Sequence, residues 1–173
     1  VSGMKALVKQ AYACGHRRIA FIHGEKTAVT ENRLTGFYQA CDELGLKVPE
    51  AYVRSSVYHD VDRCAEETRA LLELPQPPTC IIFPDDFSAL GGYNAIREKK
   101  LSIPEDVSVM GYDGIYLSRV VVPPLVTYQQ NTVALGRTAA DKLIEMIEHP
   151  RVTIPEQIRV SGKLLDGGSV RIL

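Results

Sequence analysis

The sequence lacks the features that mark several common classes of protein. It has only four cysteines, which are far apart, form no CxxC pair and have no histidine at ligand spacing; they are Cys14, Cys41, Cys64 and Cys80. Neither a zinc site nor a redox motif is indicated, so we expect reduced core cysteines in a cytoplasmic protein. No run approaches the roughly 18 apolar residues of a membrane span, and no signal-peptide core is found at the start. We expect no association with a membrane.

The charge is nearly balanced, which argues against a nucleic-acid-binding protein. The chain has 20 Lys and Arg against 21 Asp and Glu, a formal net charge of -1. Binding to nucleic-acid phosphates depends on clustered Lys and Arg, so this chain by itself is not expected to bind DNA or RNA. With 173 residues, 45% of them hydrophobic, it is long enough for one core and short for two.

Motifs for catalysis and for nucleotide binding are also missing. No GxSxG elbow occurs, and none of Ser88, Ser108 and Ser118 has an obvious histidine partner. The GxGxxG and P-loop patterns are absent, which leaves nucleotide phosphates without an anchor. The pair Asp85 and Asp86 could hold Mg²⁺ in a phosphoacceptor site, but such a site needs a lysine at the end of a later strand, and none stands there. We therefore expect no cofactor, no metal and no enzyme activity.

Helix-like and strand-like stretches alternate along the chain. Apolar residues at helical spacing predict helices over 3–13, 31–44, 61–72, 87–99 and 132–148. Apolar runs of strand length predict strands at 18–22, 52–54, 79–83, 107–111, 125–128 and 158–165. This rhythm predicts an α/β fold with an open, mostly parallel sheet flanked by helices and joined by right-handed crossovers.

Three polar side chains stand where an apolar strand gives way to a loop or helix. They are Arg33 in ENRLTGF, Asp85 in FPDDFSALG and Asp113 in VSVMGYDG. In an open α/β sheet, the carboxyl ends of the strands face the crevice where small ligands bind. Arg33, placed in the first turn of its helix, could clamp hydroxyls or a carboxylate in bidentate fashion. The sequence therefore predicts a pocket for a small polar molecule.

Each of these residues also has an ordinary structural explanation. Arg33 could pair with a loop carboxylate such as Glu31. One of the two aspartates at 85 and 86 should cap a helix, and we take Asp85 as the one that is free to face the cleft. Asp113 could be a turn residue that bonds its own backbone. Tyr58 could form an aromatic wall, or be an exposed loop residue, and Gln130 could contact ligand hydroxyls or be solvated.

Six segments, read in order, resemble the effector-binding region of bacterial LacI/GalR transcription factors. They are GHRRIAFIHG, ENRLTGFYQA, PTCIIFPDDFSALGGYNAIRE, SIPEDVSVMGYDG, PPLVTYQQN and GRTAADKLIEMI. The resemblance spans essentially the whole chain. It implies a periplasmic-binding-protein-like fold of two α/β lobes, joined by three crossovers, that closes around a small effector, with a sugar expected ahead of a nucleobase.

The resemblance also implies roles for particular residues. Arg33, Asp85, Asp113 and Gln130 match polar effector ligands, and Tyr58 matches an aromatic position in the cleft. Family members work as homodimers and bind operator DNA through an N-terminal helix-turn-helix domain. Candidate dimer contacts lie on helix 87–99 and on the segment after Asp113; they are Leu90, Tyr93, Ile96, Tyr116 and Val120.

The front of a full family member has no counterpart in this sequence. The resemblance implies that residues 1–131 form the C-terminal lobe, that 132–150 belong to a helix of the other lobe, and that 151–173 return to the C-terminal lobe. The DNA-binding domain and most of the N-terminal lobe would precede Val1. Two other functions stay open: a solute-binding protein of a sugar transporter, and an α/β enzyme that uses Asp85 or Asp113 as a base.

Overall fold

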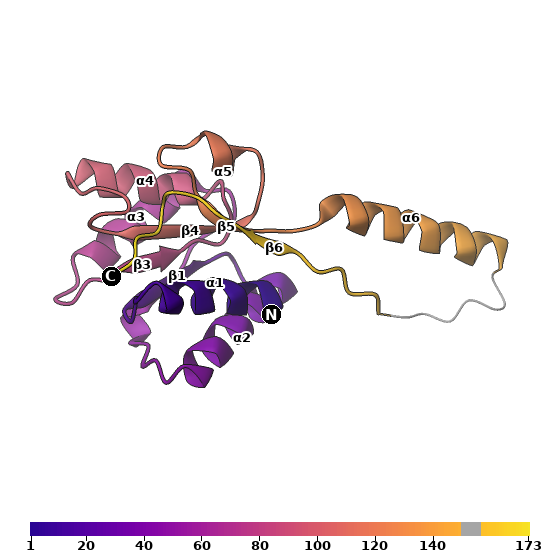
Figure 1. The fold of residues 1–173 in the computed structure, drawn as a ribbon, viewed down its shortest axis with the longest axis horizontal. Coiled ribbons are helices and arrows are strands. Elements are labelled where there is room, and N and C mark those ends of the chain that lie inside the picture. The colour runs from indigo at the N-terminus through magenta and orange to yellow at the C-terminus, as the bar shows by residue number, and fades with distance from the viewer. Residues whose placement is uncertain (150–156) are drawn as a thin grey trace.

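The computed structural model of the chain describes residues 1–149 and 157–173, which contain one six-stranded sheet. Figure 1 shows how its helices and strands are arranged. The strand order is β2-β1-β3-β4-β5-β6; the first five strands are parallel, and β6 runs antiparallel to β5. The strands are β1 Ile19–His23, β2 Val53–Ser55, β3 Cys80–Ile82, β4 Ser108–Asp113, β5 Val126–Gln129 and β6 Lys163–Leu165. The helices are α1 Ser2–Ala13, α2 Ala28–Glu43, η1 Glu50–Tyr52, α3 Val61–Leu72, α4 Ala89–Glu98, α5 Leu117–Val120 and α6 Thr132–Glu148.

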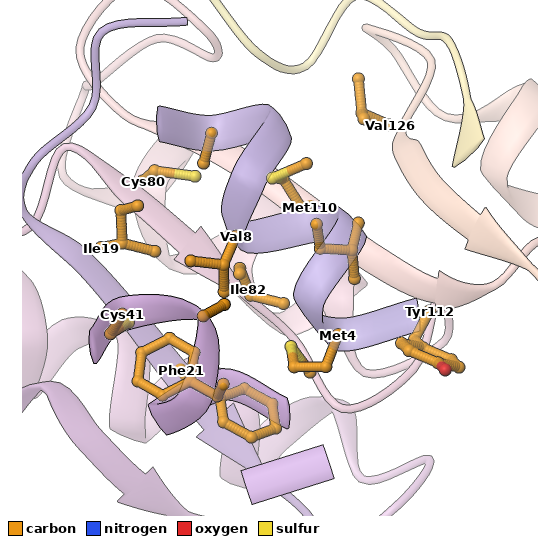
Figure 2. Packing of buried hydrophobic residues seen from close by; sticks show 14 residues of the cluster. Met4, Val8, Ile19, Phe21, Cys41, Cys80, Ile82, Met110, Tyr112 and Val126 are labelled. Atoms are coloured by element: carbon orange, nitrogen blue, oxygen red, sulfur yellow. The ribbon is translucent and has the colours of Figure 1, made fainter. Parts of the chain in front are cut away.

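Helices cover both faces of this sheet and bury two separate apolar clusters. In one cluster, α1 and α2 pack on the sheet through residues such as Met4 and Cys41 (Figure 2). In the other, α3 and α4 pack on the opposite face through residues such as Leu71 and Ile96. Because side chains of a strand alternate between faces, Phe21 of β1 joins the first cluster and Ile22 the second. The prediction of an open, mostly parallel α/β sheet is confirmed.

Several predicted boundaries differ from the structure. Helix α2 begins at Ala28, not at 31, because the side chain of Thr27 accepts the backbone N–H of Thr30 at 3.2 Å and so caps the helix earlier. Arg33 therefore lies in the second turn of α2, not in the first. The strand predicted at 158–165 pairs with the sheet only from Lys163 to Leu165.

Helix α6 follows β5 and stands away from the sheet (Figure 1). None of its residues is buried, and apolar side chains such as Leu143, Ile144 and Ile147 are exposed. The helix begins at Thr132 and ends at Glu148, which are the bounds predicted from the sequence.

The cysteine and membrane predictions can be compared with the described part of the chain. All four cysteines are free thiols there, and Cys41, Cys64 and Cys80 are buried. Burial raises the pKa of Cys41 to about 11, so this thiol stays protonated and inert. Among the described helices, none is both long and apolar enough to cross a membrane.

Two of the residues expected at a dimer interface lie in the core instead. Ile96 is fully buried and Tyr93 is 5% exposed, with its hydroxyl donating to the carbonyl of Pro123 at 2.8 Å. The expectation is wrong for both, because the apolar face of α4 packs on the sheet and on α3. Leu90 is partly buried, whereas Tyr116 and Val120 are exposed, so these three stay predictions.

The buried side chain of His16 contacts both the C-terminal segment and the residue before β3. His16 is fully buried; its Nε2 lies 3.2 Å from the carbonyl oxygen of Arg171, and its Nδ1 lies 2.9 Å from Oγ1 of Thr79. Because a carbonyl can only accept, Nε2 carries the proton and Nδ1 accepts from the Thr79 hydroxyl in the neutral ring. Burial lowers the pKa of His16 below its ordinary value of 6.5.

We expect this histidine to make the protein less stable in mild acid. Since its pKa is lower in the folded than in the unfolded state, the stability it contributes is fully present above pH 6.5 and is lost as the pH falls through the folded-state pKa. Thermal melts from pH 7.5 to 5.5 should therefore show a smaller decrease in Tm for His16→Gln than for the wild type. His23→Gln is the matched control and should keep the wild-type slope; equal slopes for all three proteins would contradict the prediction.

Candidate functional site

Arg33 and Asp113 meet at the carboxyl end of the parallel sheet. Helix α2 follows β1 and carries Arg33, while Asp113 is the last residue of β4. The Arg33 Nη2 atom lies 3.1 Å from Oδ1 of Asp113, and the two side chains are 8% and 28% exposed. The sequence analysis placed both residues at this edge, and the structure brings them into direct contact. Arg33 does not pair with Glu31, the alternative partner.

Arg33 is held by more than this ion pair. Its Nη1 donates to the carbonyl of Pro84, which follows β3. Its guanidinium carbon lies 3.9 Å from the ring centre of Tyr112 and 5.5 Å from that of Tyr58. Burying a guanidinium is costly unless it is paired and hydrogen-bonded, and these contacts meet that need. The planar group is thus fixed in direction before any ligand arrives.

Asp113 is positioned by an unusual backbone conformation and by Gln130. Its φ angle is 101°, in the left-handed region that residues other than glycine rarely adopt. The side-chain amide of Gln130 donates to Oδ1, the same oxygen that Arg33 contacts, and the Gln130 backbone N–H donates to the Asp113 carbonyl at 3.1 Å. Among the described residues, none donates a hydrogen bond to Oδ2 of Asp113. That oxygen can accept one from a ligand.

Tyr58 closes one side of this group. Its hydroxyl lies 3.0 Å from Oγ1 of Thr30, and its backbone N–H donates to a carboxylate oxygen of Glu25 at 2.9 Å. The ring lies directly on Gly24, where a Cβ atom would come within 2.3 Å of it. Glycine after β1 therefore makes room for the tyrosine, which is half-buried beside Arg33 instead of free in solvent.

Asp85 does not face the cleft as a free carboxylate, so the choice between the two aspartates was wrong on this point. Its Oδ1 accepts the backbone N–H of Ser88 at 2.7 Å, and its Oδ2 accepts the Ser88 hydroxyl at 2.8 Å. Oδ2 also accepts the backbone N–H of His59 at 3.2 Å, and the residue is 1% exposed. Asp85 therefore caps the turn that opens α4, the role that we had left for its neighbour.

The structure adds residues that the sequence analysis did not single out. Tyr112 was part of an apolar strand, and only the packing shows its ring beneath Arg33. His59, with a φ angle of 62°, and Phe87 form an exposed edge-to-face pair with ring centres 6.1 Å apart. Non-glycine residues in the left-handed region often mark functional positions. A histidine just before a helix cap gives no sequence signal for such a pair.

The chemistry of this group suits binding better than reaction. One cation, one carboxylate with a free oxygen, one amide and phenol rings can hydrogen-bond a polar ligand and stack on its ring. A hollow beside Gln130 is lined by residues 129–133 and 161–163. In the described part of the chain, no three His, Cys, Asp or Glu side chains are placed to hold a metal ion.

Comparison with known proteins places these observations in a family. The model of the periplasmic binding protein-like domain matches residues 8–170. The HTH-type transcriptional repressor PurR of Haemophilus influenzae strain PittEE is 35% identical over 153 residues, which are 88% of this chain and 45% of that protein. The repressor CytR of Escherichia coli K12 is 32% identical over 96% of this chain and 48% of its own length. The chain spans about half the length of these relatives.

Solved structures of transcriptional regulators have the same fold as this chain. A putative transcriptional regulator LacI from Bacillus cereus subsp. cytotoxis superposes with a TM-score of 0.92 at 29% identity, over 98% of this chain and 60% of that one. A lac repressor dimer bound to operator and the anti-inducer ONPF superposes with a TM-score of 0.87 at 25% identity, over 98% of this chain and 58% of that one.

Proposed function

This chain belongs to the periplasmic binding protein-like family, and we propose that it is the effector-sensing region of a LacI/GalR-type transcriptional repressor. In this proposal it binds a small polar effector and works with a DNA-binding domain elsewhere in the protein. The proposal gives no residue a catalytic role, and Asp85, one of the two candidate bases, already accepts hydrogen bonds from Ser88 and His59.

The observation that carries the proposal is the Arg33–Asp113–Gln130 group. Arg33 and Gln130 both contact Oδ1 of Asp113, and no described residue donates a hydrogen bond to Oδ2. Vicinal hydroxyls of a sugar fit this arrangement, because one hydroxyl can donate to Oδ2 while its neighbour accepts from a guanidinium. The ring N–H and N atoms of a nucleobase offer the same pair of functions. We propose a sugar first and a nucleobase as the alternative, with Tyr58 against the ring of either.

The proposed mechanism is a shift between an open and a closed form. A ligand that contacts Arg33 and Asp113 on one side and a second lobe on the other binds the closed form more tightly. The difference between its two affinities is the free energy available to change operator binding. Gln130 stands two residues before α6, so a movement of α6 relative to the sheet would reach the group at Asp113 directly.

We propose that α6 packs in the second lobe, while residues 1–131 and the segment returning through β6 form the C-terminal lobe. A groove between α6 and residues 158 and 160 is lined by apolar side chains, among them Leu135, Leu143 and Met146. The matched relatives are about twice as long as the matched region, which leaves enough chain to cover this face. For a homodimer contact, the partly buried Leu90 and the exposed Tyr116 and Val120 are the candidates that remain.

A ligand screen tests the proposal. We expect a full-length protein containing both lobes to gain several degrees in Tm with one member of a panel of pentoses, hexoses, purine bases and nucleosides. For the 173-residue chain alone we expect little or no shift, because one wall of the cleft is missing. A shift of several degrees in this chain would mean that one lobe suffices. If no compound stabilises the full-length protein, the proposed function is wrong.

A further inference from the structure

The second aspartate of the FPDDF motif has no part in capping α4, yet it is buried at the edge of the candidate site. Asp86 is 1% exposed. Its Oδ1 accepts the hydroxyl of Thr127 in β5 at 2.5 Å, and its Oδ2 accepts the backbone N–H of Ile115 at 2.8 Å. Since Asp85 already accepts the N–H of Ser88, helix capping does not explain a second buried carboxylate.

The contacts of Asp86 lie on both sides of Asp113 along the chain. Its backbone N–H donates to the carbonyl of Tyr112 at 2.9 Å, and its carboxylate holds the N–H of Ile115. The two residues between these points are Asp113 and Gly114, whose φ angles are 101° and 68°. A left-handed conformation at a non-glycine residue persists only where the surrounding structure fixes it. Asp86 holds the backbone on both sides of this pair, through its own N–H and its carboxylate.

Gly111 provides the space for this carboxylate. A Cβ atom at residue 111 would lie 2.3 Å from Oδ1 of Asp86 and 2.6 Å from Cδ2 of Leu125. The glycine of the VMGYDG segment is therefore required by Asp86, in the strand that ends at Asp113. Thr127, fully buried on the next strand, completes the enclosure.

We infer that Asp86 is the positioning residue of the proposed ligand site: its carboxylate fixes the turn from Asp113 to Ile115 and so the direction in which Asp113 presents its free oxygen. Asp86 itself is buried and need not touch the ligand. The role of Asp86 in ligand binding rests on the proposed function. Its role in fixing the turn can be measured without a ligand.

The groups around Asp86 shift the pKa of its carboxyl group. A residue that only fills space would have no such titration to measure. Asp113 faces Asp86 from β4, the Thr127 hydroxyl from β5, the N–H groups of Gly114 and Ile115 from the loop, and Asp85 adjoins it in sequence. Among the described residues, no cation contacts it. Burial, opposed by the hydrogen bonds from Thr127 and Ile115, raises the pKa of Asp86 to about 6. Protonation near that pH removes charge from the acceptor of the Ile115 N–H, so the hydrogen bond weakens.

NMR spectroscopy of the 173-residue chain tests the structural part. We expect the Ile115 amide resonance to titrate with a midpoint near pH 6, and to lose this titration in Asp86→Asn, with amide exchange at least tenfold faster. Asp113→Asn should keep the titration, which assigns it to Asp86. Asp106→Asn is the matched control, because Asp106 accepts the Ser102 N–H at the same 2.8 Å at the far end of β4. Ile115 exchange unchanged in Asp86→Asn would overturn the inference.

If Asp86→Asn does not fold, Thr127→Val decides. It removes one donor from the same carboxylate without changing the shape of the side chain. The midpoint of the Ile115 titration should therefore rise and the exchange of its amide should become faster; no change overturns the inference.

Calorimetry of the full-length protein with D-ribose and with hypoxanthine tests the role of Asp86 in ligand binding. Where either binds the wild type, at least tenfold weaker binding to Asp86→Asn supports the inference, and equal affinity refutes it while the proposed function stands. Where neither binds, the ligand screen of the full panel decides on the proposed function, and the NMR titration still decides on Asp86.

Discussion

Arg33→Ala should abolish ligand binding by the full-length protein, with a loss of affinity of more than 100-fold. The substitution removes a guanidinium that contacts Asp113 and the Pro84 carbonyl and stacks on Tyr112. Truncating one member of a buried, hydrogen-bonded charge pair costs about 2–5 kcal/mol, and each 1.4 kcal/mol is tenfold in affinity. The loss combines a missing ligand contact with a carboxylate at Asp113 that has lost its cation. Isothermal titration with the tightest compound of the panel measures it.

Two further variants separate binding from folding. Arg33→Lys keeps the charge but loses the planar fork, and we expect an intermediate loss of affinity. Arg54→Ala is the matched control: Arg54 forms an ion pair with Glu67 at 2.8 Å, but on β2, with its side chain 38% exposed. Its affinity should equal that of the wild type. If Arg33→Ala binds the ligand as tightly as Arg54→Ala, the proposed pocket is wrong.

The sequence was most informative where one physical pattern acts alone. Apolar periodicity located the five long helices, because each buries a continuous face on the sheet or presents one, and the apolar strands followed from burial on both faces. The position of Arg33 and Asp113 at the carboxyl end of the sheet followed from their places after predicted strands of a parallel sheet, and the structure shows the two side chains 3.1 Å apart. The ligand-binding roles of these residues stay predictions that the experiments above decide.

The sequence could not show which of Asp85 and Asp86 caps α4 and which contacts the loop after β4. Both are aspartates after a strand, and either could cap α4; the outcome depends on which carboxylate reaches Ser88 and which reaches Ile115, a contact between segments 29 residues apart. Two of the dimer candidates failed for a similar reason. Tyr93 and Ile96 are apolar residues of an amphipathic helix, and the sequence does not say whether their face meets the sheet or another chain. The burial of both residues shows that it meets the sheet.

The largest effect on stability is expected from a single added methyl group, in Gly91→Ala. Helix α4 contains two consecutive glycines, a composition that weakens an isolated helix. A Cβ atom at residue 91 would lie 2.2 Å from the carbonyl oxygen of Val61 and 2.7 Å from the backbone N of Ala65. Both atoms belong to the backbone of α3, so neither can rotate aside, and the two helices would have to separate.

The gain in helix propensity from Gly91→Ala, about 1 kcal/mol, opposes an overpacking cost of about 1–3 kcal/mol or more. Because the clash is with backbone, we expect a cost at the upper end of that range and a net fall in the free energy of unfolding of about 2 kcal/mol. Gly136→Ala is the matched control: it makes the same exchange in α6, where a Cβ atom would meet nothing within 4 Å. There only the propensity term acts, so stability should be unchanged or higher by up to about 1 kcal/mol. Urea unfolding of both variants measures the difference, and equal midpoints would show that α3 and α4 are not packed as closely as described.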